Sequence, residues 1–184
     1  MTPNIFFSTS RLIARGMALA DVEPFVAYRS NADVARYQSW ENYTLEEGRA
    51  LVEEMQASRP GIPGAWYQFA LENVTSGELV GDLAARINPD EHRELEVGFT
   101  LAPQHQGKGY GTEALTGLLG YAFDSLGVRR VIAVTDALNF SAAALLTRVG
   151  MRQEAHFKEN VFFKGSWGSE FVFALLASEW PVDT

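Results

Sequence analysis

Three glycines in one short segment constrain this chain most, because they lie between a strand-like run and a long helical pattern. Gly107, Gly109 and Gly111 fall within residues 104–114, and glycine lets successive backbone amides turn inward around an anion. The helix expected after them adds the positive end of its dipole. The sequence therefore predicts a strand, a phosphate-binding loop and a helix, in that order.

The elements on both sides of the loop follow from the spacing of apolar residues. Over residues 94–101, apolar and polar positions alternate as in a strand. From Ala114 to Leu126, apolar residues recur every three to four positions, which predicts one helix. Gly127 is expected to end that helix.

Spacing separates three kinds of phosphate-binding loop. A nucleotide P-loop needs Gly-Lys followed by Ser or Thr, whereas Gly109 follows Lys108. The dinucleotide fingerprint needs Gly-x-Gly-x-x-Gly, which these glycines do not match. The remaining pattern is Gln-x-x-Gly-x-Gly at Gln104, Gly107 and Gly109. An ordinary glycine-rich helix start is the open alternative.

Composition and net charge indicate which classes of binding partner to expect. A length of 184 residues suits one domain, residues 1–184, and 47% hydrophobic with 21% charged residues is typical of a soluble globular protein. No apolar run reaches the roughly twenty residues that cross a bilayer, and residues 1–10 do not resemble a signal peptide. We therefore expect a cytoplasmic protein without a membrane partner. The net charge of -8 disfavours nucleic acid and favours cationic partners such as amines.

Metal and thiol chemistry are not expected. The chain has no cysteine, which excludes disulfides and a cysteine nucleophile. Its three histidines, His92, His105 and His156, do not pair at the spacing of metal ligands.

The remaining elements come from caps, turns and periodicity. Asp21 is expected to cap a helix over residues 22–30, and Thr44 with Glu47 forms a capping box for a helix through Ser58. A short helix is expected after Asn31. Further strands are predicted over residues 11–17, 66–71, 79–87, 130–135, 151–157 and 171–176, with a helix over 141–149. Strand 130–135 is apolar enough for burial on both faces. Together they give a mixed α and β fold around one largely antiparallel sheet.

Several segments together resemble the RimJ/RimL-like branch of the GNAT N-acetyltransferase superfamily. Besides residues 107–114, the similarity rests on residues 10–15, 95–99, 136–139, 149–151 and 179–180. The resemblance implies the GNAT fold, an α/β fold whose central, mostly antiparallel sheet has splayed central strands flanked by helices. It also implies transfer of an acetyl group from acetyl-CoA to a primary amine by direct attack in a ternary complex. The acceptor is then a protein N-terminal α-amine or a small-molecule amine.

The same resemblance assigns residues to acetyl-CoA, with no metal. The pantetheine arm is expected between strands 94–101 and 130–135. Gly98 would be a bulge, a point of close backbone approach or simply a glycine tolerated in the strand. The residues expected at the cofactor are Val97, Phe99, Gln104, Gln106, Gly107, Lys108, Gly109, Tyr110, Gly111, Thr112 and Asn139. Asn139 is equally compatible with a plain helix N-cap.

Glu96 is the candidate general base, because this fold covers its face of the strand with helices, where a carboxylate without a role is costly. It would accept the proton of an ammonium acceptor directly or through water. The alternative is a solvated edge that carries Glu94 and Glu96. A free backbone N–H near Phe99 or Thr100 would stabilise the developing oxyanion.

The chain departs from the family pattern at the general acid. Ala142 and Leu146 stand where relatives carry serine or tyrosine, so Ser141 and Tyr110 are the remaining candidates. A thiol with a pKa of about 8.5 also leaves adequately as the anion. Ser169 stands where relatives often have aspartate, a departure that concerns the local loop and not the fold.

The acceptor wall is expected from the early helices and the loop after them. Its candidates are Tyr37, Gln38, Trp40, Glu41, Tyr43, Trp66 and Glu96. Aromatic rings beside acidic side chains suit a cationic amine, and a place in the hydrophobic core is the alternative for the rings. A non-catalytic acyl-CoA binding or regulatory module is the alternative function, and a homodimer is left open.

Overall fold

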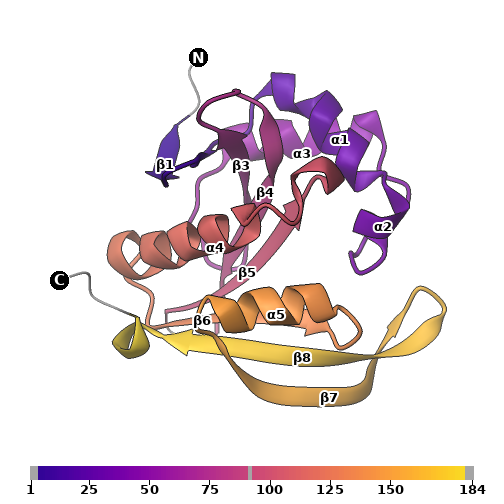
Figure 1. Cartoon of the computed structure of the whole chain (residues 1–184), viewed down its shortest axis with the longest axis vertical. Coiled ribbons are helices and arrows are strands. Elements are labelled where there is room, and N and C mark those ends of the chain that lie inside the picture. Colours follow the sequence, from indigo (N-terminus) through magenta and orange to yellow (C-terminus); the bar gives the residue numbers. More distant parts are fainter. Residues whose placement is uncertain (1–3, 91–92, 181–184) are drawn as a thin grey trace.

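A computed structural model describes residues 4–90 and 93–180, so His92 lies outside the described residues. Within these ranges, eight strands form one sheet in the order β1-β2-β3-β4-β5-β6-β8-β7 (Figure 1). Neighbouring strands are antiparallel except β5 and β6, which run parallel. The predicted mixed α/β fold with a mostly antiparallel sheet is confirmed.

The strands match the sequence pattern best where one face is buried. They are β1 (Ile5–Ser8), β2 (Leu12–Arg15), β3 (Trp66–Asn73), β4 (Leu79–Ile87), β5 (Glu94–Leu101), β6 (Arg130–Asp136), β7 (Arg152–Phe163) and β8 (Ser166–Leu176). The prediction for β5 is confirmed over its full length. β1 is missing from the prediction, and β7 and β8 are longer than predicted. β7 is exposed at most positions, so it lacks the alternation that marks a half-buried strand.

The helices begin largely where the capping residues predict. They are α1 (Val22–Arg29), α2 (Ala32–Ala35), α3 (Leu45–Ala57), α4 (Tyr110–Gly120) and α5 (Phe140–Arg148). The capping box is confirmed, since Thr44 Oγ1 accepts from the Glu47 amide at 3.2 Å and Glu47 Oε2 accepts from the Thr44 amide at 2.7 Å. Asp21 occupies the predicted N-cap position of α1, but its side chain makes no capping hydrogen bond. Its carboxylate instead accepts from the Arg15 guanidinium, at 2.7 and 2.9 Å, and from the Ala18 amide.

The long helix predicted after the glycine loop is interrupted. α4 is followed by one π-helical turn, Tyr121–Ser125, in which the Leu126 amide donates to the Tyr121 carbonyl at 3.1 Å. The Tyr121 ring packs edge-on against Phe69 of β3. Gly127, with φ of 62°, ends the helical segment as predicted.

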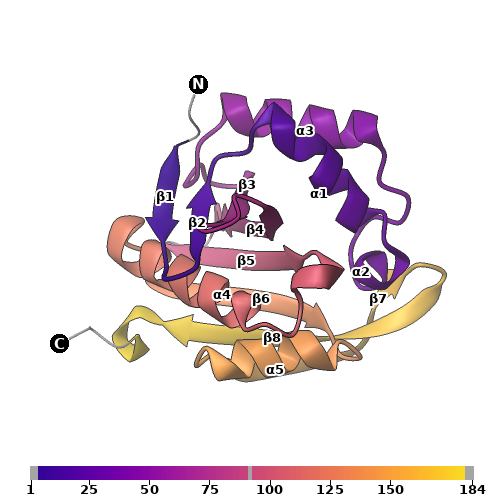
Figure 2. The ribbon, with the colours of Figure 1, turned by 45° about the horizontal axis from the view of Figure 1, so that its top comes forward.

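Helices cover both faces of the sheet. α1 and α3 lie on one face, and α4 and α5 lie on the other (Figure 2). The apolar stripe of α4 is confirmed, because Leu115, Leu118 and Leu119 are fully buried. Among the described residues, none of the helices combines the length and the apolar character needed to span a membrane.

Candidate functional site

β5 and β6 are paired at one end and separate at the other. The two strands pair only over residues 94–96 and 130–132. Beyond these positions β5 continues to Leu101 and β6 to Asp136 without further pairing to each other. Backbone groups on the facing edges are therefore left without a strand partner. The separation expected from the family resemblance lies directly after Glu96.

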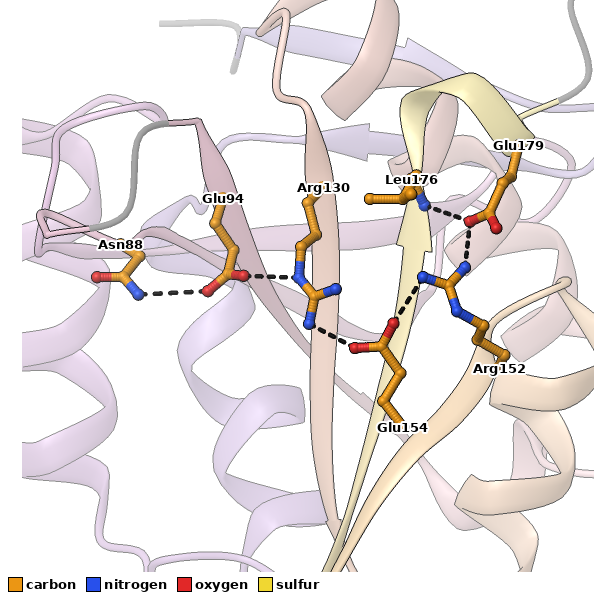
Figure 3. Close-up of polar contacts among 7 residues, drawn as sticks. All are labelled: Asn88, Glu94, Arg130, Arg152, Glu154, Leu176 and Glu179. Atoms are coloured by element: carbon orange, nitrogen blue, oxygen red, sulfur yellow. Dashed lines mark hydrogen bonds and ion pairs between the residues drawn. The ribbon is translucent and has the colours of Figure 1, made fainter.

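Ion pairs connect the strands at the paired end (Figure 3). Arg130 of β6 donates to Glu94 of β5 at 2.8 Å and to Glu154 of β7 at 2.7 Å. Arg152 then joins Glu154, at 2.6 Å, to Glu179. The hydrogen bond from Arg130 lowers the pKa of Glu154, an effect that burial opposes. We call these five residues the closed-end network.

A cavity of about 180 Å³ lies where the strands have separated. We call it the interstrand cavity. It is lined by Tyr37, Gln38, Val97, Gly98, Phe99, Ala133, Val134, Thr135, Asp136, Asn139, Ala142, Leu146, Val161, Phe163 and Glu170. Both strands, α5, the loop after α2 and the β7–β8 hairpin therefore contribute walls.

A larger groove of about 810 Å³ reaches the glycine loop. We call it the loop groove. It is lined by Asp33, Val34, Tyr37, Gln38, Phe99, Thr100, Leu101, Gln106, Gly107, Gly109, Gly111, Thr112, Asn139, Ser141, Ala142, Ala144, Leu145 and Arg148. Tyr37, Gln38, Phe99, Asn139 and Ala142 line both spaces. The cavity and the groove therefore adjoin between the glycine loop and the separated strands, and we call the two together the channel.

The glycines of the loop serve two purposes. Gly107 and Gly109 have φ of 71° and 82°, a left-handed conformation that favours glycine. Gly109 precedes α4 and contributes no capping side chain, so the first amides of α4 are uncapped. Gly111 differs from the prediction that it uncovers an amide. It lies within α4, where an added Cβ would lie 3.2 Å from the Leu145 side chain of α5, so the packing of α4 against α5 leaves little room for a side chain.

A carboxylate on α4 fixes the glycine loop from behind. Glu113 accepts hydrogen bonds from Thr9 Oγ1 at 2.6 Å, from the Arg11 amide at 2.7 Å and from Arg11 Nε at 2.6 Å. Arg11 also donates to the Lys108 carbonyl at 3.0 Å. Burial alone would raise the pKa of Glu113, but these hydrogen bonds outweigh it and lower the pKa. The sequence patterns did not identify Glu113, because its partners precede it by about a hundred residues.

Most residues predicted at the cofactor line the channel. Gln106, Gly107, Gly109, Gly111 and Thr112 line the loop groove, Val97 lines the interstrand cavity, and Phe99 and Asn139 line both. Gln104 instead borders a separate hollow beside α1. The Lys108 side chain lines neither space, although its carbonyl is held by Arg11.

The two candidate acids lie in different places. Ser141 lines the loop groove. Tyr110 lines neither part of the channel, and its hydroxyl accepts from Asn73 of β3 at 2.9 Å. Its ring packs under the Arg11 guanidinium, 4.6 Å from the ring centroid. Because Tyr110 lies outside the channel, the prediction that it is the general acid is wrong.

Asn139 caps α5, since its Oδ1 accepts from the Ala142 amide at 3.2 Å. This bond confirms the N-cap reading. Because Asn139 also lines the interstrand cavity and the loop groove, capping and cofactor contact are compatible.

Glu96 lies at the last position of β5 that pairs with β6. Its carboxylate accepts from Arg86 of β4 at 2.5 Å, and the side chain is 22% exposed. Glu94 is 15% exposed and ion-paired with Arg130, so the solvated-edge alternative is wrong. Glu96 is two residues from Gly98, which lines the interstrand cavity, although Glu96 itself is not among the lining residues.

Gly98 stays in regular register with Ala84 of β4, so the predicted bulge is wrong. A Cβ added at Gly98 would meet only Ala84, at 3.7 Å.

Of the aromatic residues predicted for the acceptor wall, some line the channel and others pack against arginines of the protein. Tyr37 lines the channel, but Trp40 packs on the Arg29 guanidinium, 3.9 Å from its ring centroid, and donates to the Arg29 carbonyl at 3.0 Å. Trp66 lies against Arg86, at 4.8 Å. Trp40 and Trp66 therefore bind the protein's own arginines and do not line the channel.

Several channel residues escaped the sequence patterns. Asp136 and Glu170 are direct partners across β6 and β8 and line the interstrand cavity. Neither forms an ion pair within the described residues. Arg148, in the last turn of α5, lines the loop groove. The prediction that β6 is buried on both faces is also wrong, since Val134 is 40% exposed and lines the cavity.

The sequence and the structure were compared with those of known proteins. Residues 11–152 match the family described as acetyltransferase (GNAT) domain. The chain is 27% identical over 173 residues to the uncharacterized N-acetyltransferase YnaD of Bacillus subtilis (strain 168), covering 94% of this chain and 98% of YnaD. A crystal structure of an acetyltransferase (GNAT family) from Bacillus anthracis matches with a TM-score of 0.85 and 26% identity, covering 94% of this chain and 99% of that one.

A third relative shares the fold at lower identity. Spermidine N-acetyltransferase from Vibrio cholerae, crystallised with CoA and spermine, has a TM-score of 0.80 and 23% identity. The match covers 94% of this chain and 99% of that one.

Proposed function

The chain belongs to the acetyltransferase (GNAT) family, and from this premise we propose that its channel binds acetyl-CoA and a primary amine together and transfers the acetyl group by direct attack. The observation that carries the proposal is the separation of β5 from β6 directly after Glu96, with the glycine loop at one end of the resulting channel. A ternary complex needs both substrates in one continuous space, and the interstrand cavity and loop groove provide it.

The loop groove suits the diphosphate of coenzyme A. Left-handed Gly107 and Gly109 turn the backbone before the uncapped amides of α4, and such amides bind anions. Arg148 adds a positive charge to the same groove. The groove volume of about 810 Å³ is in the range of small-molecule sites. Bound there, acetyl-CoA supplies an activated acetyl thioester.

The unpaired edge of β5 suits the rest of the cofactor. Beyond Glu96, β5 remains paired with β4, but its N–H and C=O groups that point away from β4 lack a partner on β6 and would bond the amides of the pantetheine arm. One N–H near Phe99 or Thr100 would also stabilise the negative charge that develops on the thioester oxygen.

The acceptor end of the channel suits a cation. Asp136 and Glu170 place two carboxylates beside each other in the interstrand cavity without an ion-pair partner in the described chain. Like charges opposite each other in a sheet are unfavourable, so an ammonium group between them is stabilising. Arg148 lies in the loop groove, so positive charge is available for the diphosphate and negative charge for the amine.

Proton transfer is assigned to two side chains. Glu96 accepts the ammonium proton, through water where its carboxylate does not reach the amine, and the neutral amine then attacks. Attack forms the C–N bond, and the C–S bond then breaks. The attacking nitrogen loses its extra proton, which Ser141 relays to the leaving thiolate, or which goes to solvent when the thiolate departs as the anion. The RimJ/RimL-like segments support a protein N-terminal α-amine as acceptor, and the spermine-bound relative supports a polyamine.

A panel of amines tests the function. The purified protein is mixed with acetyl-CoA and with polyamines, amino acids or peptides that have a free N-terminus. We expect free thiol with at least one acceptor, and a product that mass spectrometry shows to carry one acetyl group. Tight binding of acetyl-CoA without thiol release on any acceptor would instead indicate a non-catalytic acyl-CoA module.

A further inference from the structure

The interstrand cavity has two walls that come from distant parts of the chain. Tyr37 and Gln38 follow α2, whereas Val161 and Phe163 belong to the β7–β8 hairpin. Figures 1 and 2 show the tip of this hairpin close to α2. We call residues 36–43 the acceptor loop, because two of them line the cavity in which the amine is proposed to bind.

Lys164 joins these two walls. Its Nζ, at the tip of the hairpin, donates to the carbonyl oxygens of Ala35 at 2.6 Å and Trp40 at 2.9 Å. The Ala35 carbonyl also accepts from the Gln38 amide at 2.9 Å. The Lys164 ammonium group and the amide of Gln38, which lines the cavity, therefore bind the same carbonyl oxygen.

The backbone at Lys164 supports a role for its side chain. Lys164 and Gly165 form the two-residue turn between β7 and β8, with φ of 47° and 84°. Turns of this kind favour Asn, Asp or Gly, because the left-handed region is unfavourable for other side chains. The two hydrogen bonds of the ammonium group offset the cost of a lysine at this position.

Other contacts also hold the acceptor loop, and at its far end the Tyr43 carbonyl accepts from Ser30 Oγ at 2.7 Å. Trp40 packs on Arg29, as described above, and the Tyr37 hydroxyl donates to the Leu138 carbonyl at 3.2 Å. Among the hydrogen bonds of the described residues, those of Lys164 are the ones that join the hairpin to this loop.

We propose that Lys164 is a positioning residue that holds the acceptor loop against the hairpin and so restricts the channel to amines on narrow carriers, such as unbranched polyamines. The inference rests on the function proposed above. A cavity of about 180 Å³ receives the amine end of an acceptor, not a folded polypeptide. Releasing Lys164 lets the loop move away, which weakens the hold on a narrow amine and admits a bulkier one.

Steady-state kinetics of Lys164→Met test this with spermidine and a short peptide that has a free N-terminus. We expect the KM for spermidine to rise about tenfold, because two charge-assisted hydrogen bonds are lost. The kcat and the KM for acetyl-CoA stay within about twofold of the wild-type values. The ratio of kcat/KM for the peptide to that for spermidine rises. Lys164→Arg restores the wild-type values, because a guanidinium also donates to two carbonyls.

Lys158→Met is the matched control, since it removes the same charge from an exposed position on β7. Hydrogen exchange over residues 36–43 gives a readout independent of turnover, and it should be faster in Lys164→Met than in Lys158→Met. Equal exchange and equal kinetics in the two variants would overturn the inference. Equal loss of kcat with both acceptors would also overturn it. If the wild type acetylates no amine, the proposed function fails, whereas faster exchange in Lys164→Met still supports the contact.

Discussion

The two ends of the β5–β6 pair use charged residues in different ways. At the paired end, Arg130 of β6 forms ion pairs with Glu94 of the adjacent β5 and with Glu154 of β7, which lies beyond β8. At the separated end, Asp136 and Glu170 face each other without a cation in the described chain. Asp136 accepts from the Leu138 amide at 2.7 Å and Glu170 from the Asn160 side chain at 2.5 Å, so both carboxylates are hydrogen-bonded but neither has a positively charged partner among the described residues. Under the proposed function, the paired end contributes stability and the separated end binds the substrates.

The largest expected effect is at the point where the strands separate. Glu96→Gln removes the proposed base, and we expect kcat to fall by about a hundredfold to ten-thousandfold. Binding of acetyl-CoA should be unchanged. Glu94→Gln, on the same face of the same strand but at the paired end, should keep kcat within about twofold. An unchanged kcat and pH profile in Glu96→Gln would show that Glu96 is not the base.

The glycine loop offers a matched pair of substitutions. Gly107 and Gly77 have φ of 71° and 70°, and neither has an atom within 4 Å of an added Cβ. Alanine should therefore cost each about 1 kcal/mol of stability. Only Gly107→Ala places a methyl group in the loop groove, and we expect it to raise the Kd for coenzyme A about tenfold. Equal affinities of the two variants in calorimetry would contradict a diphosphate site at this loop.

Substitutions at the paired end should lower the stability of the protein and leave catalysis unchanged. Arg130→Met leaves the part-buried Glu94 carboxylate without its ion-pair partner, so we expect the free energy of unfolding to fall by about 1–2 kcal/mol. Arg152→Met, at the exposed end of the same network, should lower the free energy of unfolding less than Arg130→Met does, because solvent screens an exposed ion pair. Chemical denaturation measures both. A larger loss in Arg152→Met, or a kcat in Arg130→Met far below the wild-type value, would remove the distinction between the ends.

The smallest expected effect is the pH dependence of this network. The hydrogen bond from Arg130 holds the pKa of Glu154 below its ordinary value of 4.5. A carboxylate with a lowered pKa in the folded state stabilises the protein fully above its unfolded pKa, and the contribution is lost as the pH falls through the folded pKa. The difference in unfolding free energy between wild type and Arg130→Met should therefore be constant near about pH 6 and shrink below about pH 4.5. A difference that does not change down to about pH 3 would contradict this origin.

Local features of the sequence predicted local features of the structure. Residues 94–101 alternate because one face of β5 is buried, and the strand has those bounds. Gly107 and Gly109 predicted a loop whose backbone turns without hindrance from side chains, and both adopt the left-handed conformation that favours glycine. The exposed strand β7 gave little pattern, because neither of its faces is consistently buried.

The predictions that failed depended on distant partners. Nothing near Trp40 or Trp66 shows that their rings bind Arg29 and Arg86. Asp136 and Glu170 meet only because β6 pairs with β8 across the sheet. Spacing along the chain therefore predicted the glycine loop and the helix after it, whereas the residues at the other end of the channel became apparent only in the three-dimensional structure.

Hydrogen exchange with and without coenzyme A tests the central claim most directly. The account predicts that coenzyme A slows exchange at the amides of residues 97–101 and 106–112 and leaves residues 94–96 and 130–132 unchanged. Protection confined to other segments, or equal protection of both ends of β5, would contradict the claim that the separated end holds the cofactor.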